Sequence, residues 1–451
     1  MTSSPPPSAA LPALPVTADL PTVAPVPDVL ADLEWRGLLA QTTDREALAR
    51  ELASGPMTVY CGFDPTADSL HVGSLVPLLA LRRFQLAGHR PIALAGGATG
   101  FIGDPTGRTA ERVLVSADVV AARVRLLGAQ MTRFLTFDDD DDDSPTGAVL
   151  ADNLDWTKDL GVLEFLRDIG AHFPVNQMLA RESVSTRLEG GGLSFTEFSY
   201  QLLQSMDYVE LYRRYGCRLQ VGGNDQWGNI TAGLDLLRRV EQASAHALTF
   251  PLVTDGAGRK IGKSTGGGNV WLDAALTTPY ALYQYLLNVE DADAGTYLRL
   301  LTFVGRDEVE QLDAATTERP QARAAQKRLA VELVALVHGA DEVARVQAAS
   351  AALFGGGELS VLDEPTLRAA LAQAPSLLLA GGPRPFAELL AEGLALSRSE
   401  ARRAVASGGA YLNNARIVDD GALPQEQDWL HGRYLVLRKG KRTVLVVERV
   451  A

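Results

Sequence analysis

The sequence predicts an α/β protein in which a doubly wound parallel sheet is followed by a helical region and a small α+β unit. Apolar strands alternate with amphipathic helices from residue 58 onward, and this alternation is typical of a parallel sheet. From residue 278 to 354 leucines recur at helical spacing, and short strands return only after two short helices that follow Pro385. Ligands of doubly wound sheets bind beyond the carboxyl ends of the strands, so we expect the functional site there.

Length and composition limit the class of protein. The 451 residues suffice for two to four domains of roughly 100–200 residues each. A hydrophobic content of 46% excludes a wholly disordered chain, and we find neither an apolar run near the roughly 18 residues of a membrane span nor a secretory signal. Two cysteines, Cys61 and Cys217, favour a reducing, cytoplasmic setting. Cysteine or histidine clusters with metal-ligand spacing are lacking, so we expect no protein metal site.

The charge is distributed unevenly. The net charge of −13 argues against nucleic-acid binding when it is taken for the whole chain. However, residues 384–451 hold 11 basic and 8 acidic residues, a net charge of +3, which leaves −16 for the rest. A basic end on an acidic body favours an RNA or phosphate partner, although chance variation explains the charge equally well.

The elements follow in order along the chain. Residues 1–28 are rich in Pro and Ala without any period and predict a disordered tail. Structure is expected from Val29, with helical spacing at Leu30 and Leu33 and a second helical segment at 45–52.

The alternating region begins with a β–α–β unit. Thr58 to Cys61 is a buried-type strand, residues 62–69 form a turn, and residues 70–86 form a helix that Gly88 ends. Pro91 to Ala95 gives the next strand.

A later helix near residues 195–214 leads to a strand at 218–221, a turn, and another helix from Ile230. The six aspartates at 138–143 repel one another, so we interpret them as a solvated loop and not as a cation site.

The first group of residues with chemical potential runs from Tyr60 to Ser74, across a strand end, a turn and a helix start. A helix N-terminus suits phosphate because its amides and dipole favour anions. Thr66 and His71 can donate hydrogen bonds to phosphate, and Gly73 lets a flat base approach the backbone. The alternative is that His71 only caps the helix.

The second group runs from Lys260 to Ser264 and is followed by a glycine run. Two lysines three residues apart can close over a polyphosphate and neutralise its moving charge. The spacing is not that of a P-loop, and a solvated basic loop is the alternative.

The third group is the glycine-rich segment 96–107, which contains Asp104. This carboxylate follows a strand end and can hold an ammonium or a hydroxyl group, while Arg108 and Arg112 can reach a phosphate. The alternative is a glycine-rich loop in which Asp104 acts as a cap.

The fourth group shares one face of a helix. At 3.6 residues per turn, Gln204 lies about 40° from Tyr200 and Asp207 about 20° on the other side. The opposite face holds Phe198, Leu202, Met206 and Val209. Periodicity alone does not separate a cleft face from a solvent face.

Together these groups resemble the signatures of class I aminoacyl-tRNA synthetases. Tyr60 to Ser74 resembles the first signature, usually His-Ile-Gly-His, and Lys260 to Ser264 the second, usually Lys-Met-Ser-Lys-Ser. The surrounding sequence, including Gly222 to Ile230, is similar to the bacterial tyrosyl-tRNA synthetases, and residues 385–450 resemble an S4-type RNA-binding domain. Four motifs in the right order over about 400 residues make chance similarity very improbable.

The resemblance implies a Rossmann-type catalytic domain at 29–275, a helical anticodon-arm-binding domain at 276–357, a linker at 358–384 and an S4-like domain at 385–451. It implies catalytic roles for Thr66, His71, Lys260, Lys263, Arg108 and Arg112. Tyrosine would be bound by Tyr60, Asp104, Tyr200, Gln204, Asp207 and Gln226. ATP would be bound by Cys61, Gly62, Asp64, His71, Gly73, Ser74, Gly222, Asp225, Lys263 and Ser264.

The implied reaction joins tyrosine to ATP, releases pyrophosphate, and passes the tyrosyl group to the 3′ end of tRNA(Tyr). Catalysis then consists of positioning and charge stabilisation, with Mg²⁺ arriving on ATP. The family forms homodimers. Three positions depart from its pattern: Ser74 replaces the usual histidine or asparagine, Ile261 and Gly262 replace Met and Ser, and Arg108 replaces a frequent lysine.

Three other functions compete with this one. The sister enzyme for tryptophan would not aim Tyr60 and Asp207 at a phenol and lacks the S4-like end. An RNA-binding protein on an inactive synthetase scaffold would have lost the signature lysines, His71 or Asp225, and all are present. A small nucleotidyltransferase with the first signature would lack residues 278–451.

Overall fold

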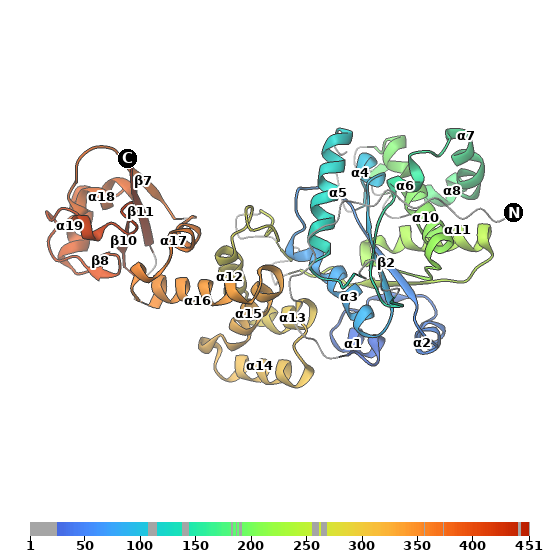
Figure 1. The fold of residues 1–451 in the computed structure, drawn as a ribbon, viewed down its shortest axis with the longest axis horizontal. Coiled ribbons are helices and arrows are strands. Elements are labelled where there is room, and N and C mark those ends of the chain that lie inside the picture. The colour runs from blue at the N-terminus through green and yellow to red at the C-terminus, as the bar shows by residue number, and fades with distance from the viewer. Residues whose placement is uncertain are drawn as a thin grey trace. The chain divides into compact units, whose positions relative to one another are not determined.

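The computed structural model describes residues 25–106, 115–137, 144–181, 184–185, 187–188, 192–254, 261–262, 268–355, 357–372, 374–440 and 443–450. The chain divides into two compact units (Figure 1). The larger unit comprises Met1–Leu276 and Val289–Leu329, and the smaller unit comprises Thr277–Asn288 and Ala330–Ala451. Among the described residues, no helix is long and apolar enough to cross a membrane.

The larger unit is built on a six-stranded sheet in the order β1-β6-β5-β2-β3-β4. Only β1 is antiparallel, and it pairs with β6 at one edge. The predicted doubly wound parallel sheet is therefore confirmed. The strands are β1 (Gln41–Thr42), β2 (Thr58–Phe63), β3 (Arg90–Ala95), β4 (Val149–Asp152), β5 (Leu219–Gly223) and β6 (His246–Phe250).

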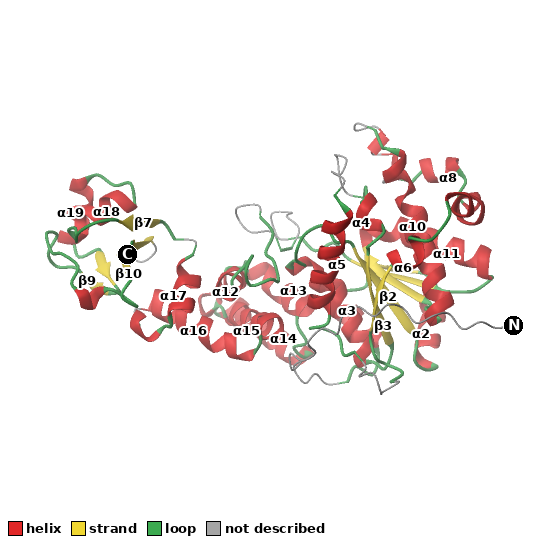
Figure 2. Cartoon of the chain, turned by 45° about the horizontal axis from the view of Figure 1, so that its top comes forward, coloured by secondary structure: helices red, strands yellow, loops and turns green. Residues whose placement is uncertain are grey.

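Helices cover both faces of this sheet (Figures 1 and 2). Helices α3 and α5 lie on one face, and α10 and α11 lie on the other (Figure 1). The helices of this unit are α1 (Val29–Trp35), α2 (Arg45–Ala53), α3 (Leu75–Leu86), α4 (Thr99–Ile102), α5 (Ala117–Met131), α6 (Leu154–Thr157), α7 (Val162–Glu164), α8 (Val175–Leu179), α10 (Phe195–Tyr215), α11 (Trp227–Glu241), α13 (Asp291–Leu301) and α14 (Arg306–Glu318).

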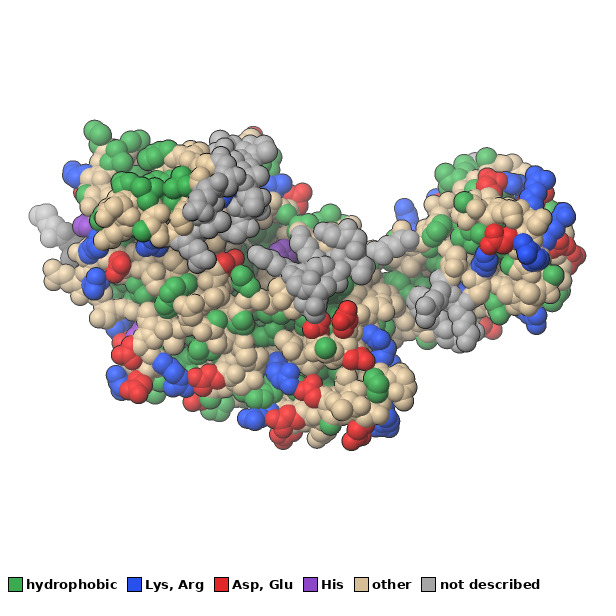
Figure 3. Space-filling view, turned by 180° about the vertical axis from the view of Figure 1, so that it is seen from behind, with side chains coloured by type: hydrophobic (Ala, Val, Ile, Leu, Met, Phe, Trp, Pro, Cys, Tyr) green, Lys and Arg blue, Asp and Glu red, His purple; other side chains and the backbone are tan. Residues whose placement is uncertain are grey.

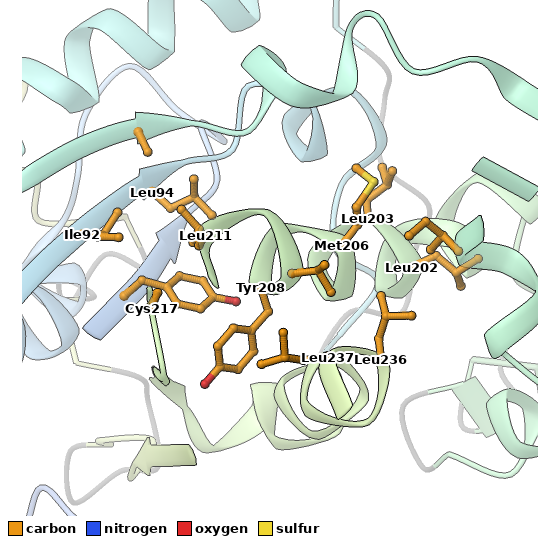
Figure 4. Packing of buried hydrophobic residues seen from close by; sticks show 14 of the residues in the cluster. Ile92, Leu94, Leu202, Leu203, Met206, Tyr208, Leu211, Cys217, Leu236 and Leu237 are labelled. Carbon is orange, nitrogen blue, oxygen red and sulfur yellow. The ribbon is translucent and has the colours of Figure 1, made fainter. Parts of the chain in front are cut away.

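Helix α10 follows from local sequence signals. The side chain of Ser194 accepts a hydrogen bond from the amide of Glu197 at the start, and Gly216 ends the helix with a φ of +61°. Its apolar side chains pack with α11 and β3 in one core, where Tyr208 and Leu237 point toward each other (Figure 4). Of the predicted apolar face, Leu202, Met206 and Val209 are buried, and Phe198 is partly buried against the same core.

The direction of chain connections reverses at β2. Tyr60 of β2 pairs with Ile92 of β3 on one side and with Gln220 of β5 on the other. The helices that follow β2 and β5 cover opposite faces of the sheet. A crevice therefore opens at the carboxyl ends of these strands, and it is the usual binding place in such folds.

The smaller unit contains helices and a second sheet in the order β7-β11-β10-β8-β9. Its core joins α18 and α19 to β10 and β11. The elements are α12 (Pro279–Leu287), α15 (Ala324–His338, which begins in the larger unit), α16 (Ala340–Gly355), η6 (Leu359–Val361), α17 (Glu364–Leu371), β7 (Ser376–Leu379), α18 (Phe386–Gly393), α19 (Arg398–Ala406), β8 (Ala410–Leu412), β9 (Ala415–Arg416), β10 (Tyr434–Lys439) and β11 (Thr443–Arg449).

One expectation needs correction. Residues 358–384 were expected to be a linker, but they contain α17 and β7. Strand β7 pairs with β11 in parallel, with Leu377 opposite Val447. The apolar run 377–379 is too short to reveal itself as a strand, because its hydrogen-bond partner lies about 70 residues away in the sequence. Residues 1–24 of the predicted tail at 1–28 and the aspartate run at 138–143 lie outside the described residues.

Two buried arginines hold the end of α13 in the larger unit. Arg83 of α3 is fully buried, and its Nη2 donates to the carbonyl of Thr302 at 2.6 Å. Arg36 donates to the same carbonyl at 3.2 Å, and Asp32 accepts from Arg36 at 2.9 Å. Burial, followed by repulsion from Arg36, lowers the pKa of Arg83 to about 9. The positive charges favour a helix C-terminus, where carbonyls lack partners within the helix.

We expect Arg83→Ala to lower the free energy of unfolding of the larger unit by about 3 kcal/mol, because it removes the shorter hydrogen bond to the buried Thr302 carbonyl, the ion pair with Asp32 and a fully buried side chain. Arg50→Ala, at a side chain that is 71% exposed, should change it by less than about 0.5 kcal/mol. Urea unfolding of both variants checks this. Equal stability of the two would contradict the role of the buried cluster.

Candidate active site

A cavity of about 250 Å³ lies at the carboxyl ends of β2, β3 and β5. Ten of the residues predicted for substrate binding line it: Tyr60, Cys61, Gly62, Asp64, Asp104, Tyr200, Gln204, Asp207, Gly222 and Gln226. They come from separate stretches of the sequence, and the sheet brings them together. The other lining residues are Phe63, Pro77, Leu94, Gly96, Thr99, Asn153, Gln220, Val221, Gly223 and Ile230.

Tyr60 and Asp207 form the most buried polar part of the cavity, with exposed fractions of 1% and 2%. The hydroxyl of Tyr60 has no hydrogen-bond partner among the described residues. One carboxylate oxygen of Asp207 accepts from Asn153 Nδ2 at 3.0 Å, and the other accepts from Trp156 Nε1 at 2.9 Å. Sequence analysis missed Asn153 and Trp156, which fix the direction of this carboxylate.

Burial raises the pKa of Asp207 to about 7, although the hydrogen bonds from Asn153 and Trp156 oppose that rise. Burial, followed by the charge of Asp207, also raises the pKa of Tyr60 well above its ordinary value. Tyr60 therefore stays a hydroxyl at neutral pH. Because each oxygen of Asp207 can accept a further hydrogen bond, the pair suits a ligand hydroxyl that both donates and accepts.

A second group surrounds Asp64. Its carboxylate accepts from the hydroxyl of Tyr200 at 2.9 Å and from that of Thr99 at 2.7 Å. Asn153 donates to Thr99 at 3.1 Å, so the group is linked to the side chains around Asp207. A Cβ atom at Gly96 would collide with Asp64, which explains the glycine at this strand end.

A third group joins Asp104 to Gln226. Gln226 Nε2 donates to Asp104 at 2.7 Å, and Asn229 donates to Gln226 at 3.1 Å. The other oxygen of Asp104 accepts from the amide of Thr106 at 2.9 Å. Asp104 therefore makes a local turn contact and also lines the cavity. Nearby, Gln204 has a buried Oε1 without a hydrogen-bond partner in the described part of the chain.

The cavity has an acidic character. Asp64, Asp104 and Asp207 line it, and none of its described lining residues is Lys or Arg. Asp152 lies behind Gly97, to which it is hydrogen-bonded, and burial raises its pKa. Carboxylates that converge in a partly buried cavity attract a cation, so the site favours a ligand ammonium group.

The described part of the second signature-like segment, Ile261 and Gly262, lies against the first. A Cβ at Gly262 would stand 3.0 Å from the amide nitrogen of Gly73. Gly262 has a φ of +84°, which explains why glycine is tolerated where serine is usual. The amide of Val72 donates to Val270 at 2.9 Å and fixes the adjoining segment.

Several predicted residues do not line the cavity. Ser74 accepts from the amide of His71 at 3.4 Å at the start of the one-turn helix η1 (Val72–Ser74). Asp225 lies in the turn η4 (Asn224–Gln226), directly after β5. Thr66, Gly73 and Ser74 belong to the segment between β2 and α3. Arg108, Arg112, Lys260, Lys263 and Ser264 lie outside the described residues.

The raised pKa of Asp207 has a consequence for stability. Between about pH 4 and pH 7 the folded chain holds a proton that the unfolded chain releases, since the ordinary pKa is 3.8. We therefore expect the free energy of unfolding to fall as the pH rises through this range, by up to about 1.4 kcal/mol per pH unit from this group.

The variant Asp207→Asn removes the titrating carboxyl group. Its free energy of unfolding should therefore not show this fall as the pH rises. Urea unfolding of both proteins from pH 4.5 to 8 measures the difference between the two slopes. Parallel profiles would show that Asp207 ionises with an ordinary pKa.

Comparison with known proteins identifies related chains. Residues 52–355 match the family described as tRNA synthetases class I (W and Y), and residues 367–447 match the tyrosine–tRNA ligase SYY-like C-terminal domain. The chain is 58% identical to a tyrosine–tRNA ligase of Mycolicibacterium fortuitum over 427 residues, which cover 94% of this chain and 99% of that one.

A tyrosine–tRNA ligase of Streptomyces coelicolor is also 58% identical, over 93% of this chain and 99% of its own. Among solved structures, a C-terminally truncated mitochondrial tyrosyl-tRNA synthetase of Aspergillus nidulans aligns with a TM-score of 0.64 and 31% identity. That alignment covers 71% of this chain and 92% of the fungal chain.

Proposed function

The chain belongs to the tyrosine–tRNA ligases, class I synthetases that use ATP to charge tRNA with tyrosine, and we propose how its residues divide this work. The phenol of the substrate binds at the buried end of the cavity, between Tyr60 and Asp207. The observation that carries this proposal is the buried, unpartnered hydroxyl of Tyr60 beside a carboxylate held by Asn153 and Trp156. A substrate hydroxyl would complete the hydrogen bonds of both.

The ammonium group of tyrosine binds among the carboxylates nearer the mouth. Asp104, Tyr200 and Gln204 hold it, and Asp64 supports it through its hydrogen bond with Tyr200. Gln226 lies beside Asp104 and faces the substrate carboxylate. This orientation points the reacting carboxylate toward the strand ends that carry the signatures.

In the first step, a carboxylate oxygen of tyrosine bonds to the α-phosphorus of Mg-ATP, and the bond to pyrophosphate breaks. A ribose hydroxyl of tRNA then attacks the tyrosyl carbonyl, and AMP leaves. Thr66, His71, Lys260, Lys263, Arg108 and Arg112 stabilise the phosphate charge as it moves. Nucleotide contacts come from Cys61, Gly62, Asp64, Gly73, Ser74, Gly222, Asp225 and Ser264.

The cysteine next to the phenol site takes no chemical part. Cys61 is buried, and burial raises the pKa of its thiol to about 12, so it remains a neutral contact for the nucleotide. Cys61 and Cys217 are both free, as we expect for an enzyme that works in the cytoplasm.

The variant Tyr60→Phe tests the phenol site. It should raise the KM for tyrosine roughly 2- to 10-fold, the effect of losing one ordinary hydrogen bond. The matched control is Tyr208→Phe. Tyr208 is equally buried and lies 5.2 Å from Tyr60 between ring centroids, but its hydroxyl donates to the carbonyl of His246 outside the cavity.

Tyrosine-dependent ATP–pyrophosphate exchange measures both variants. An unchanged KM in Tyr60→Phe, or an equal rise in Tyr208→Phe, would exclude the proposed phenol site. Exchange with phenylalanine as fast as with tyrosine in the parent chain would contradict it as well.

We propose that the chain is a homodimer through an apolar surface of the larger unit. Large hydrophobic side chains are exposed along residues 162–195, among them Leu163 at 83%, Phe195 at 77% and Val162 at 74%. Leu166, Val175, Leu179 and Leu188 are exposed in the same stretch. Figure 3 displays hydrophobic side chains gathered on the upper left of this unit. Such a concentration is typical of an interface.

The variant Leu163→Asp should weaken dimerisation at least about 30-fold, because it places a charge in an apolar interface. The control Val361→Asp changes a side chain that is 71% exposed in the smaller unit and should leave dimerisation unaltered. Sedimentation equilibrium gives both dissociation constants. A Leu163→Asp dimer as tight as the parent would refute this interface.

We propose that the helical region and the S4-like domain bind tRNA. Residues 276–357 would meet the anticodon arm, and the S4-like domain at 385–451 would add basic contacts from Arg398, Arg402 and Arg403 on α19. The side chain of Arg402 is 70% exposed, and Figure 3 displays Lys and Arg side chains gathered on this domain. Exposed cations on a domain with a net charge of +3 suit a phosphate backbone.

Truncation after Gly357 should preserve ATP–pyrophosphate exchange and sharply reduce the charging of tRNA. The cut removes the whole second sheet, whereas a cut after Gly382 would leave β7 without its partner β11. The salt dependence of tRNA binding should also flatten, since phosphate contacts are lost. Normal charging by the folded, truncated protein would contradict the proposed grip.

A further inference from the structure

The tip of the β8–β9 hairpin touches the end of α16 within the smaller unit. The two turn residues, Asn413 and Asn414, have φ values of +46° and +71°, as a two-residue type I′ turn requires. The side chain of Asn413 donates to the backbone carbonyl of Asp428 in the same domain at 2.6 Å. That of Asn414 instead donates to the carbonyls of Ala352 at 2.5 Å and Gly357 at 2.7 Å.

Arg438 of β10 completes this contact. It is 8% exposed, and its Nη1 donates to the carbonyl of Leu353 and to Oδ1 of Asn414, both at 2.8 Å. The carbonyls of Ala352 and Leu353 are among the last four of α16, which have no partner inside a helix. A guanidinium also interacts favourably with the negative end of a helix dipole.

We propose that Asn414 and Arg438 form a clamp on the end of α16 that holds the S4-like domain in one orientation for tRNA. They are positioning residues, because they act through the domain and not on the substrate. The inference rests on the proposed tRNA grip. Its structural basis is that both side chains belong to the second sheet and donate hydrogen bonds to carbonyls at the end of α16.

Another basic residue follows the clamp closely in the sequence. Arg416 of β9 is two residues after Asn414, and Tyr411 pairs with it across the hairpin. A second contact joins the domain to the segment before α17, where His431 Nε2 lies 2.9 Å from the carbonyl of Leu362. A domain that is already held at two places loses less conformational entropy when RNA binds. Its affinity for RNA is therefore higher.

Two variants remove the clamp and spare the fold. Asn414→Gly keeps the positive φ of the turn but loses the amide, and Arg438→Met keeps the buried stem but loses the donors. The matched control is Arg449→Met on β11, whose hydrogen bonds go to Gly432 and Glu426 within the same domain. Arg438→Lys, which retains a donor, serves as the conservative variant.

We expect Asn414→Gly and Arg438→Met to lower kcat/KM for tRNA about 10-fold, since the domain must then be ordered on binding. ATP–pyrophosphate exchange should remain at the parent level, and Arg438→Lys should recover part of the charging. A dye at Ser407→Cys should show faster anisotropy decay in the two clamp variants than in the Arg449→Met control.

Three results would overturn the clamp. The first is parent-like charging and anisotropy in both clamp variants. The second is an equal loss of charging in Arg449→Met. The third is a C-terminal domain of Asn414→Gly that unfolds at a lower temperature than that of the parent protein. The last would mark the contact as part of the domain's folding. These outcomes are distinct from failure of the tRNA grip, which would appear as normal charging by the protein truncated after Gly357.

Discussion

The position of β2 between β3 and β5, parallel to both, is the constraint on which the rest of the site depends. The connections that leave β2 and β5 cover opposite faces of the sheet, so no helix closes the crevice at their carboxyl ends. Residues at the end of β2 and directly after it therefore face those at the end of β5, with Tyr60 and Asp64 on one side and Gly222 on the other. The helix α10 contributes the polar side chains of Tyr200, Gln204 and Asp207 to the same crevice.

Burial gives this crevice its selectivity. Asp207 is 2% exposed, so burial disfavours its charged form, and the hydrogen bonds from Asn153 and Trp156 act against that effect. The same burial leaves the hydroxyl of Tyr60 without a protein partner. In the proposed binding mode, an amino acid with a phenol completes the hydrogen bonds of both groups, whereas one without a hydroxyl leaves them unsatisfied. The chemistry that distinguishes substrates thus arises from the desolvation of protein groups.

The cavity and the C-terminal residues 384–451 differ in charge. Carboxylates line the cavity and suit an ammonium group, whereas residues 384–451 have a net charge of +3. The second sheet is completed by β7, which enters before the S4-like segment and pairs with its last strand. The C-terminal segment is therefore joined to the helices before it by backbone pairing and by the side chains that contact the end of α16.

The sequence by itself located β2, α3, β3, α10 and β5 of the larger unit, since periodicity is a local property, and the face shared by Tyr200, Gln204 and Asp207. The strands β1, β4 and β6 were not predicted. The sequence did not decide whether that face met solvent or a cleft. Thr99, Asn153 and Trp156 carried no periodic signal, because their role comes from contacts such as that between Asn153 and Asp207, 54 residues apart. The strand β7 was missed for the same reason. Hydrogen-bond partners distant in sequence are set by packing, and only the tertiary structure decides them.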